Sequence, residues 1–161
     1  MPEDDAGVPG PAPLVAIVMG SASDMGVMDD CAKQLDEFDV PYEMTVASAH
    51  RQPAKVHEWA SGLEARGVKV VIAAAGKAAH LAGVVAAFTA LPVVSVPIKT
   101  SDLGGLDSLL SMVQMPGGVP VACVAINGAR NAAILATQML GTSMPEYRER
   151  VSELKRQMAE G

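Results

Sequence analysis

His50 and Arg51 stand side by side in the segment Ser48-Ala49-His50-Arg51, directly after an apolar run at 42–48. An imidazole gains and loses a proton near neutral pH, so His50 can serve a reaction as both acid and base. The planar Arg51 guanidinium has the geometry to bind a phosphate or a carboxylate. Taken singly, a loop histidine is more often structural and an arginine can simply form a surface ion pair. Their adjacency favours proton transfer on an anionic small molecule.

A second polar segment, Gly20-Ser21-Ala22-Ser23-Asp24, follows the apolar run 14–20. Backbone N–H groups at the start of a helix, together with the Ser21 and Ser23 hydroxyls, can hold an anion. Only Gly20 precedes the expected helix, and neither GxGxxG nor GK[ST] is present, so the segment favours a single phosphate over a dinucleotide. Asp24 has two open interpretations, a helix cap or a carboxylate that accepts hydrogen bonds from sugar hydroxyls.

The third segment is Ala75-Gly76-Lys77-Ala78-Ala79-His80, after the apolar run 68–75. His80 fits two interpretations equally well, a partly buried histidine with its hydrogen bonds satisfied and a catalytic histidine. His57 is interpreted as structural. His50 and His57 lie two helical turns apart, and the sequence shows no ligand spacing that indicates a metal site. The GxSxG motif of serine hydrolases is also absent.

The composition narrows the class of protein. The chain has 161 residues, of which 50% are apolar and only 3% aromatic, with a net charge of −6. Proteins that bind nucleic acid need a basic face for the phosphates and aromatic side chains that stack on the bases. An acidic chain with few aromatic residues does not fit this class. Cys31 and Cys123 lack metal or redox spacing, which favours free thiols in a reducing compartment. With no signal peptide or membrane-spanning run, we expect a cytoplasmic protein.

The elements that must position these segments alternate along the chain. Residues 1–13, rich in Pro, Gly and acid, predict a disordered tail, and 14–161 a single domain. Strands are expected at 14–20, 42–48, 68–75, 92–98 and 119–126, and helices at 24–38, 53–66, 78–90, 106–114, 129–140 and 145–159. This alternation predicts an α/β fold, a three-layer, doubly wound parallel sheet of the flavodoxin or Rossmann type. Ligands bind such sheets beyond the carboxyl ends of the strands, where all three polar segments would lie.

Two features predict contact between subunits. The nearly unbroken apolar stretch 84–91 is expected to leave apolar surface uncovered, although a fully buried helix in a monomer would give the same pattern. The last helix, 145–159, carries an apolar stripe and is otherwise charged, so it can reach beyond the core toward a neighbour. The stripe consists of Tyr147, Val151, Leu154 and Met158.

Four motifs in one order carry a family resemblance: GSASD, SAHRQP, AAHLAG and GLDSLLSMVQMPGGVPVACVAING. Over about residues 14–140 the chain resembles the N(5)-carboxyaminoimidazole ribonucleotide mutases of bacterial purine biosynthesis. The resemblance implies an isomerase that moves a carboxylate from the exocyclic nitrogen of an aminoimidazole ribonucleotide to a ring carbon. It implies decarboxylation followed by recarboxylation, with no metal or organic cofactor, in a homo-octamer with sites at subunit interfaces.

The resemblance also implies roles for individual residues. His50 matches the catalytic histidine, which protonates the leaving nitrogen and later removes the ring proton. Arg51 matches a phosphate contact. The other matching positions are substrate-binding: Ser21 and Asp24 in the first motif, Ser48 with Arg51 in the second, and Gly76, Ala78, His80 and Leu81 in the third.

Three residues depart from the family pattern: Lys77 and Ser95 stand where glycine is usual, and Ala82 where proline is. Lys77 places a cation near the expected substrate carboxylate, where it can contact substrate or point to solvent. Three alternatives remain at this point: a carboxylase using free carbon dioxide, a non-catalytic nucleotide- or flavin-binding module, and a related mutase of another pathway. The AAHL stretch favours the mutase over the carboxylase, and the scarcity of aromatic residues disfavours flavin stacking.

Overall fold

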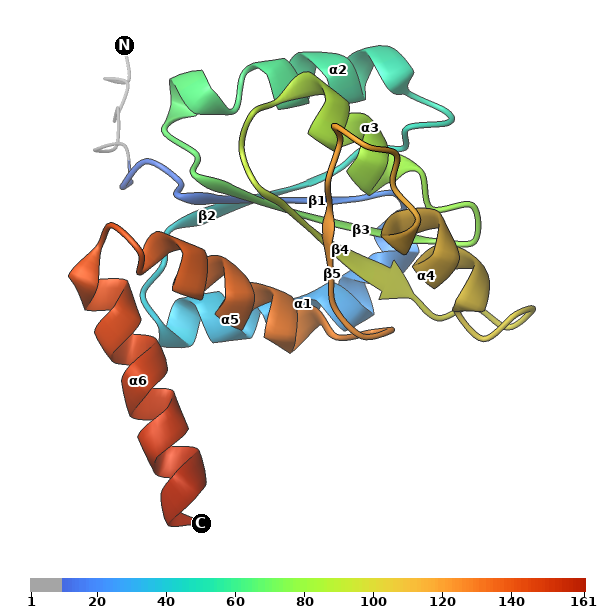
Figure 1. Ribbon diagram of the computed structural model, residues 1–161. Coiled ribbons are helices and arrows are strands. Elements are labelled where there is room, and N and C mark those ends of the chain that lie inside the picture. The colour runs from blue at the N-terminus through green and yellow to red at the C-terminus, as the bar shows by residue number, and fades with distance from the viewer. Residues whose placement is uncertain (1–9) are drawn as a thin grey trace, which may run out of the picture.

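A computed structural model describes residues 10–161, so the predicted tail lies largely outside the described residues. At its centre is one sheet of five parallel strands in the order β2-β1-β3-β4-β5 (Figure 1). The strands are β1 (Val15–Met19), β2 (Tyr42–Val46), β3 (Val70–Gly76), β4 (Val93–Ile98) and β5 (Ala122–Cys123). The chain reverses its winding direction between β1 and β3, which is where such sheets bind ligands.

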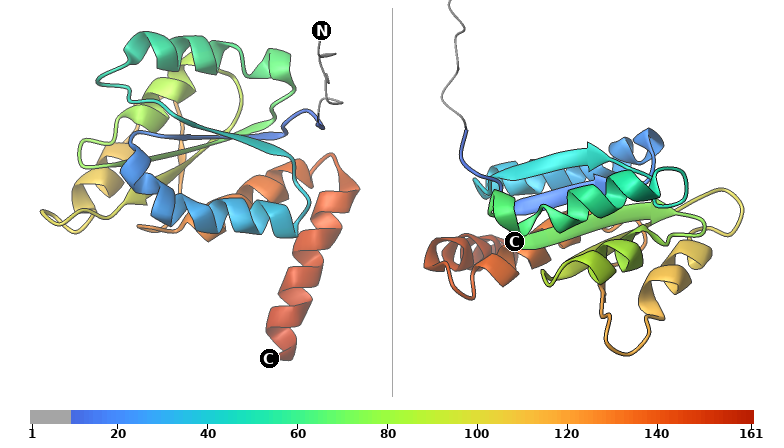
Figure 2. Two further views of the ribbon diagram at one scale, coloured as in Figure 1. Left: turned by 180° about the vertical axis from the view of Figure 1, so that it is seen from behind. Right: turned by 90° about the horizontal axis from the view of Figure 1, so that it is seen from above.

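Helices cover both faces of the sheet, which confirms the predicted three-layer fold (Figure 2). One face packs on α1 (Met25–Glu37) and α5 (Ala129–Leu140), and the other on α2 (Pro53–Ser61), α3 (Leu81–Phe88) and α4 (Leu106–Val113). Alternation along β1 explains the two cores: Val15, Ile17 and Met19 belong to the first, and Ala16 and Val18 to the second. Because both faces are buried, the strand is apolar throughout rather than alternating.

The predicted helix 53–66 is two elements. The α-helix ends at Ser61, and after a turn a short 3-10 helix, η2 (Glu64–Arg66), leads to Gly67 in the left-handed conformation at φ 91°. The break follows from packing, because Leu63 must enter the core and Arg66 must reach β2.

The predicted helix 78–90 begins three residues late, at Leu81, since Lys77 turns the chain at φ 53°.

The predicted fifth strand, 119–126, shrinks to two residues. Pro97 lies inside β4, and its carbonyl accepts a hydrogen bond from the Asn127 amide on the β5 side. As a proline it has no N–H to complete the ladder there, and Pro120 lacks one at the other end of the predicted strand. The pairing is therefore confined to Val94 with Ala122 and Ser95 with Cys123.

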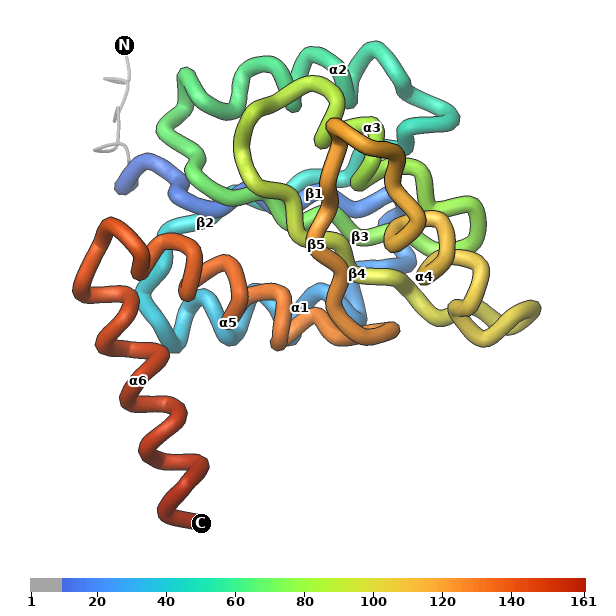
Figure 3. Tube along the Cα trace, in the orientation of Figure 1, coloured from blue at the N-terminus to red at the C-terminus, as the bar shows by residue number. Residues whose placement is uncertain are grey.

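The last helix, α6 (Pro145–Glu160), starts against α5 and then leaves the body of the protein (Figure 3). Of its predicted apolar stripe, Tyr147 and Val151 are buried, while Met158 is 61% exposed. Its outer half is thus available to a neighbour, as the sequence predicts, but the contact itself stays a prediction. No helix in residues 10–161 has both the length and the apolar content needed to cross a membrane.

An ion pair ties β2 to the η2 turn. Arg66 donates from Nε and Nη2 to the two carboxylate oxygens of Glu43, at 3.1 and 2.7 Å, and Trp59 Nε1 donates to Glu43 at 3.0 Å. Because the pair is about one-third exposed and bidentate, we expect Glu43→Gln to lower the free energy of unfolding by about 1–2 kcal/mol. Urea unfolding followed by circular dichroism and by Trp59 fluorescence measures the change.

The matched control for Glu43 is Asp30→Asn. The Asp30 carboxylate lies 4.0 Å from the Lys33 ammonium on the exposed face of α1, and pairs of this kind contribute little. Its unfolding free energy should stay within about 0.5 kcal/mol of the parent. Equal losses in the two variants would contradict a special role for the Glu43 cluster.

Candidate active site

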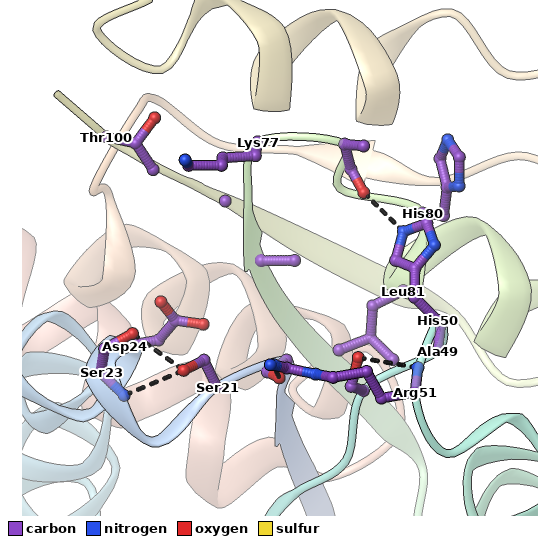
Figure 4. Close-up of a pocket in the computed structure, with 15 residues that line it drawn as sticks. Ser21, Ser23, Asp24, Ala49, His50, Arg51, Lys77, His80, Leu81 and Thr100 are labelled. Carbon is purple, nitrogen blue, oxygen red and sulfur yellow. Dashed lines mark hydrogen bonds between the residues drawn. The ribbon is translucent and has the colours of Figure 1, made fainter. Parts of the chain in front are cut away.

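A cavity of about 390 Å³ lies at the carboxyl ends of the central strands (Figure 4). Loops after β1, β2, β3 and β4 all contribute to its wall. The structure brings together in this one cavity all nine residues that the sequence singled out: Ser21, Asp24, Ser48, His50, Arg51, Gly76, Ala78, His80 and Leu81. Their location agrees with the expected sheet edge, and their individual roles stay predictions.

The serine loop after β1 is organised by Ser21. Its Oγ accepts hydrogen bonds from the Ser23 amide at 3.3 Å and from the Ser23 hydroxyl at 2.9 Å, which caps the 3-10 helix η1 (Ala22–Asp24). The Asp24 side chain makes no capping hydrogen bond, so its interpretation as a helix cap is wrong. Asp24 is buried at the cavity wall, and burial raises the pKa of its carboxyl. A hydrogen bond that the carboxyl accepts from the Ser21 backbone lowers the pKa and offsets part of this rise. The carboxyl is placed to accept hydrogen bonds from a ligand.

His50 and His80 form the other side of the cavity. His50 Nε2 lies 2.9 Å from the carbonyl oxygen of Ala78. A carbonyl can only accept, so Nε2 carries the proton in this arrangement and a neutral His50 keeps Nδ1 free as a base. The His80 ring lies beside it, with ring centroids 4.8 Å apart. His80 is exposed, so the interpretation as a satisfied, partly buried histidine is wrong.

Arg51 connects the second loop to the first. Its amide donates to Ser48 Oγ at 3.3 Å, and its guanidinium Nη2 is 3.5 Å from the Gly20 carbonyl. The ion pairs within residues 10–161 do not include Arg51, so the surface-ion-pair interpretation fails there. The guanidinium is exposed beside the serine loop and has donors to offer an anion (Figure 4).

The three departures from the family pattern have different settings. Ser95 is fully buried in β4, where its hydroxyl donates to the Ala122 carbonyl at 3.1 Å and so supports the short β5 pairing. Ala82 is buried in the second core on α3. Lys77 lines the cavity, and its ammonium lies 2.9 Å from the Asp102 carboxylate. Only Lys77 therefore bears on the chemistry of the site.

Sequence reasoning missed Thr100 and Asp102, on the loop between β4 and α4. Thr100 lines the cavity, and Asp102 pairs with the cavity-lining Lys77. The signal was present, since polar residues follow the fourth predicted strand just as they follow the first three.

Two other chemistries have no place in the cavity. Within the described part of the chain, no three His, Cys, Asp or Glu side chains gather closely enough to hold a metal ion. Cys31 is buried in the core, which raises the pKa of its thiol to about 12 and leaves it unreactive as a nucleophile. The remaining candidates for proton transfer at the cavity are His50, His80 and Asp24.

Lys77 occupies a conformation that suits glycine. Its φ of 53° costs a residue with a Cβ about 1 kcal/mol relative to glycine. We expect Lys77→Gly to raise the free energy of unfolding by up to about 1 kcal/mol, because the exposed ion pair it loses contributes less. Lys77→Ala, which also loses the pair but keeps a Cβ, is the control in urea unfolding. A glycine variant no more stable than the alanine variant would show that the backbone is unstrained.

Comparison with known proteins identifies the family of the chain. The family model described as AIR carboxylase matches residues 14–161. The chain is 57% identical over 146 residues to the N5-carboxyaminoimidazole ribonucleotide mutase of Thermotoga maritima, covering 91% of this chain and 85% of that protein. Its identity to the protein of the same name from Pyrococcus horikoshii is 55% over 146 residues, covering 91% and 82%. The crystal structure of Treponema denticola PurE superposes with a TM-score of 0.85 at 30% identity, covering 92% of each chain. The chain belongs to the AIR carboxylase family.

Proposed function

We propose that the protein is an N(5)-carboxyaminoimidazole ribonucleotide mutase, an isomerase of de novo purine biosynthesis. The observation that carries the proposal is the placement of His50 in a cavity between an anion-binding serine loop with Arg51 and the loop of Gly76 to His80. The family and the relatives at 55–57% identity support the same activity.

We propose one orientation for the substrate in the cavity. Its phosphate binds Arg51 and the serine loop, since a guanidinium and hydroxyl donors favour a dianion. Asp24 accepts hydrogen bonds from the ribose hydroxyls. The imidazole ring and the migrating carboxylate then lie against the third loop, between Ala78 and Leu81, close to His50.

His50 moves one proton in each half of the reaction. Protonated His50 gives its proton to the exocyclic nitrogen as the N–C bond to the carboxylate breaks, which releases carbon dioxide and aminoimidazole ribonucleotide. The ring carbon C4 then attacks carbon dioxide and forms the new C–C bond. Neutral His50 removes the C4 proton, so the ring regains aromaticity and His50 returns to its starting state. Atoms and charge balance with no cofactor in the scheme.

Retention of carbon dioxide requires a small, closed site. The wall formed by Ala75, Gly76, Ala78 and Leu81 is built from small or apolar groups, which suit a flat ring and a neutral gas molecule. Because His50 and His80 are exposed in the single chain, retention of carbon dioxide requires that something cover the cavity during the reaction. A second subunit is the natural cover.

Assembly into a homo-octamer in the cytoplasm is part of the proposal. Supporting it are large apolar side chains, each at least 41% exposed, on α3, α4 and the loop before α4: Phe88, Leu103, Leu106, Leu110 and Val113. Such apolar surface is typical of subunit interfaces. Analytical ultracentrifugation measures the assembly, and a monomer at micromolar concentration would contradict it.

A direct assay tests the activity. The purified protein should convert N(5)-carboxyaminoimidazole ribonucleotide to the 4-carboxy isomer without ATP, added metal or bicarbonate. The competing activity, direct carboxylation, would require high bicarbonate with aminoimidazole ribonucleotide and would leave the N-carboxylated compound unused. A bound yellow chromophore would instead indicate a flavin-binding module.

A further inference from the structure

Lys77 is the cation of the cavity that the proposed reaction has not used. It lines the wall opposite Arg51 and the serine loop, next to Thr100 (Figure 4). The cavity therefore presents two cationic side chains on two different walls. A ligand with a single phosphate needs only one of them.

The backbone at Lys77 shows that this side chain is held at a cost. The left-handed φ of 53° suits glycine, and strained positions of this kind cluster where a side chain serves the site. The following residue, Ala78, offers its carbonyl to His50, so the same turn positions both the lysine and the histidine partner. The turn places an ammonium on the wall that also holds the catalytic proton carrier.

Asp102 holds the ammonium in the unliganded protein. The two groups are 2.9 Å apart, on neighbouring loops, with side chains 68% and 64% exposed. The hydrogen bond and charge of Asp102, with a smaller contribution from Asp107, raise the pKa of Lys77, which shows that Asp102 favours the charged amine. An exposed pair of this kind is weak, so a ligand anion can compete with Asp102 for the lysine.

We propose that Lys77 is a specificity residue of the active site, which binds the substrate's migrating carboxylate in exchange for Asp102. The proposal rests on the mutase function proposed above. It assigns the two cations of the cavity to the two anionic groups of one ligand, with Arg51 on the phosphate and Lys77 on the carboxylate. Lys77 then distinguishes carboxylated ribonucleotides from aminoimidazole ribonucleotide, which has only the phosphate.

The contact acts on binding more than on rate. The carboxylate loses its charge as carbon dioxide forms, so an ammonium beside it stabilises the bound substrate at least as well as the transition state. Removing the lysine should raise KM and leave kcat unchanged or slightly higher. Removing Asp102 should act in the opposite direction, because it frees the lysine from its competitor.

The test compares Lys77→Met, Lys77→Arg and Asp102→Asn. Isothermal calorimetry measures the Kd of each for the stable 4-carboxy product and for aminoimidazole ribonucleotide. We expect Lys77→Met to raise the Kd for the 4-carboxy product about tenfold and the Kd for aminoimidazole ribonucleotide less than about twofold. Lys77→Arg should recover most of the lost affinity for the 4-carboxy product. Asp102→Asn should lower the Kd for this product about threefold.

Two results would overturn the proposal. If Lys77→Met and Asp102→Asn both weaken binding of the 4-carboxy product, the ion pair only holds the two loops together. If Lys77→Met weakens binding of both ribonucleotides equally, the lysine does not recognise the carboxylate. A parent protein that binds both ribonucleotides but turns over neither would defeat the mutase function alone, because the ratio of the two Kd values still tests Lys77.

Discussion

The His50→Asn variant is expected to lose carboxylate transfer while it still binds the ribonucleotide. Asparagine can donate to the Ala78 carbonyl, as His50 Nε2 does at 2.9 Å, so the loop geometry can be kept. An amide cannot titrate, however, so it neither protonates the leaving nitrogen nor removes the C4 proton. Loss of a general acid–base group costs about 10²–10⁴-fold, and here the same group serves both halves of the reaction.

Single-turnover and steady-state assays measure this loss, with calorimetry for ligand affinity. We expect kcat to fall at least about 10³-fold and the Kd for aminoimidazole ribonucleotide to change less than about threefold. The matched control is His57→Asn, since His57 packs edge-on against Phe88 and is not among the cavity-lining residues. Turnover retained in His50→Asn would refute the role of His50, and His80 would become the candidate.

The positions of the site residues followed from the sequence because they depend on topology. A run such as 14–20, apolar at every position, is typical of a strand covered on both faces, and parallel strands share one carboxyl edge. The rule placed His50, Arg51 and the serine loop together, although they are separated by about thirty residues, and the structure agrees. Long elements and their order are set by periodicity, which a single sequence displays.

Local geometry was less predictable because it depends on tertiary contacts. Apart from the glycine usual at this position in the family, nothing in the pattern around Lys77 indicates its positive φ. This conformation delays α3 to Leu81 and directs the Ala78 carbonyl toward His50. The pairing of Lys77 with Asp102 joins loops 25 residues apart in sequence and becomes visible only in three dimensions. The two-residue β5 likewise depends on Pro97 of the adjoining strand facing it.

Arg51→Met is expected to have the second largest effect, mainly on substrate affinity. The guanidinium can form two charge-assisted hydrogen bonds to a phosphate, and each contributes about 1.5–3 kcal/mol. We expect KM to rise about 100-fold or more with a smaller fall in kcat, because the phosphate does not change charge during the reaction. Folding should be unaffected, since the side chain is exposed and its contact to the Gly20 carbonyl is long at 3.5 Å.

Inorganic phosphate separates a phosphate contact from a general loss of function. In the parent protein it should inhibit competitively, and in Arg51→Met that inhibition should largely disappear. Arg51→Lys should recover only part of the affinity, because an ammonium keeps the charge but lacks the planar pair of donors. Arg148→Met, on α6 and outside the cavity, is the charge-matched control. If Arg51→Met retains phosphate inhibition at the parent's level, the phosphate must bind elsewhere, and the orientation that gives Lys77 the carboxylate would have to be reversed.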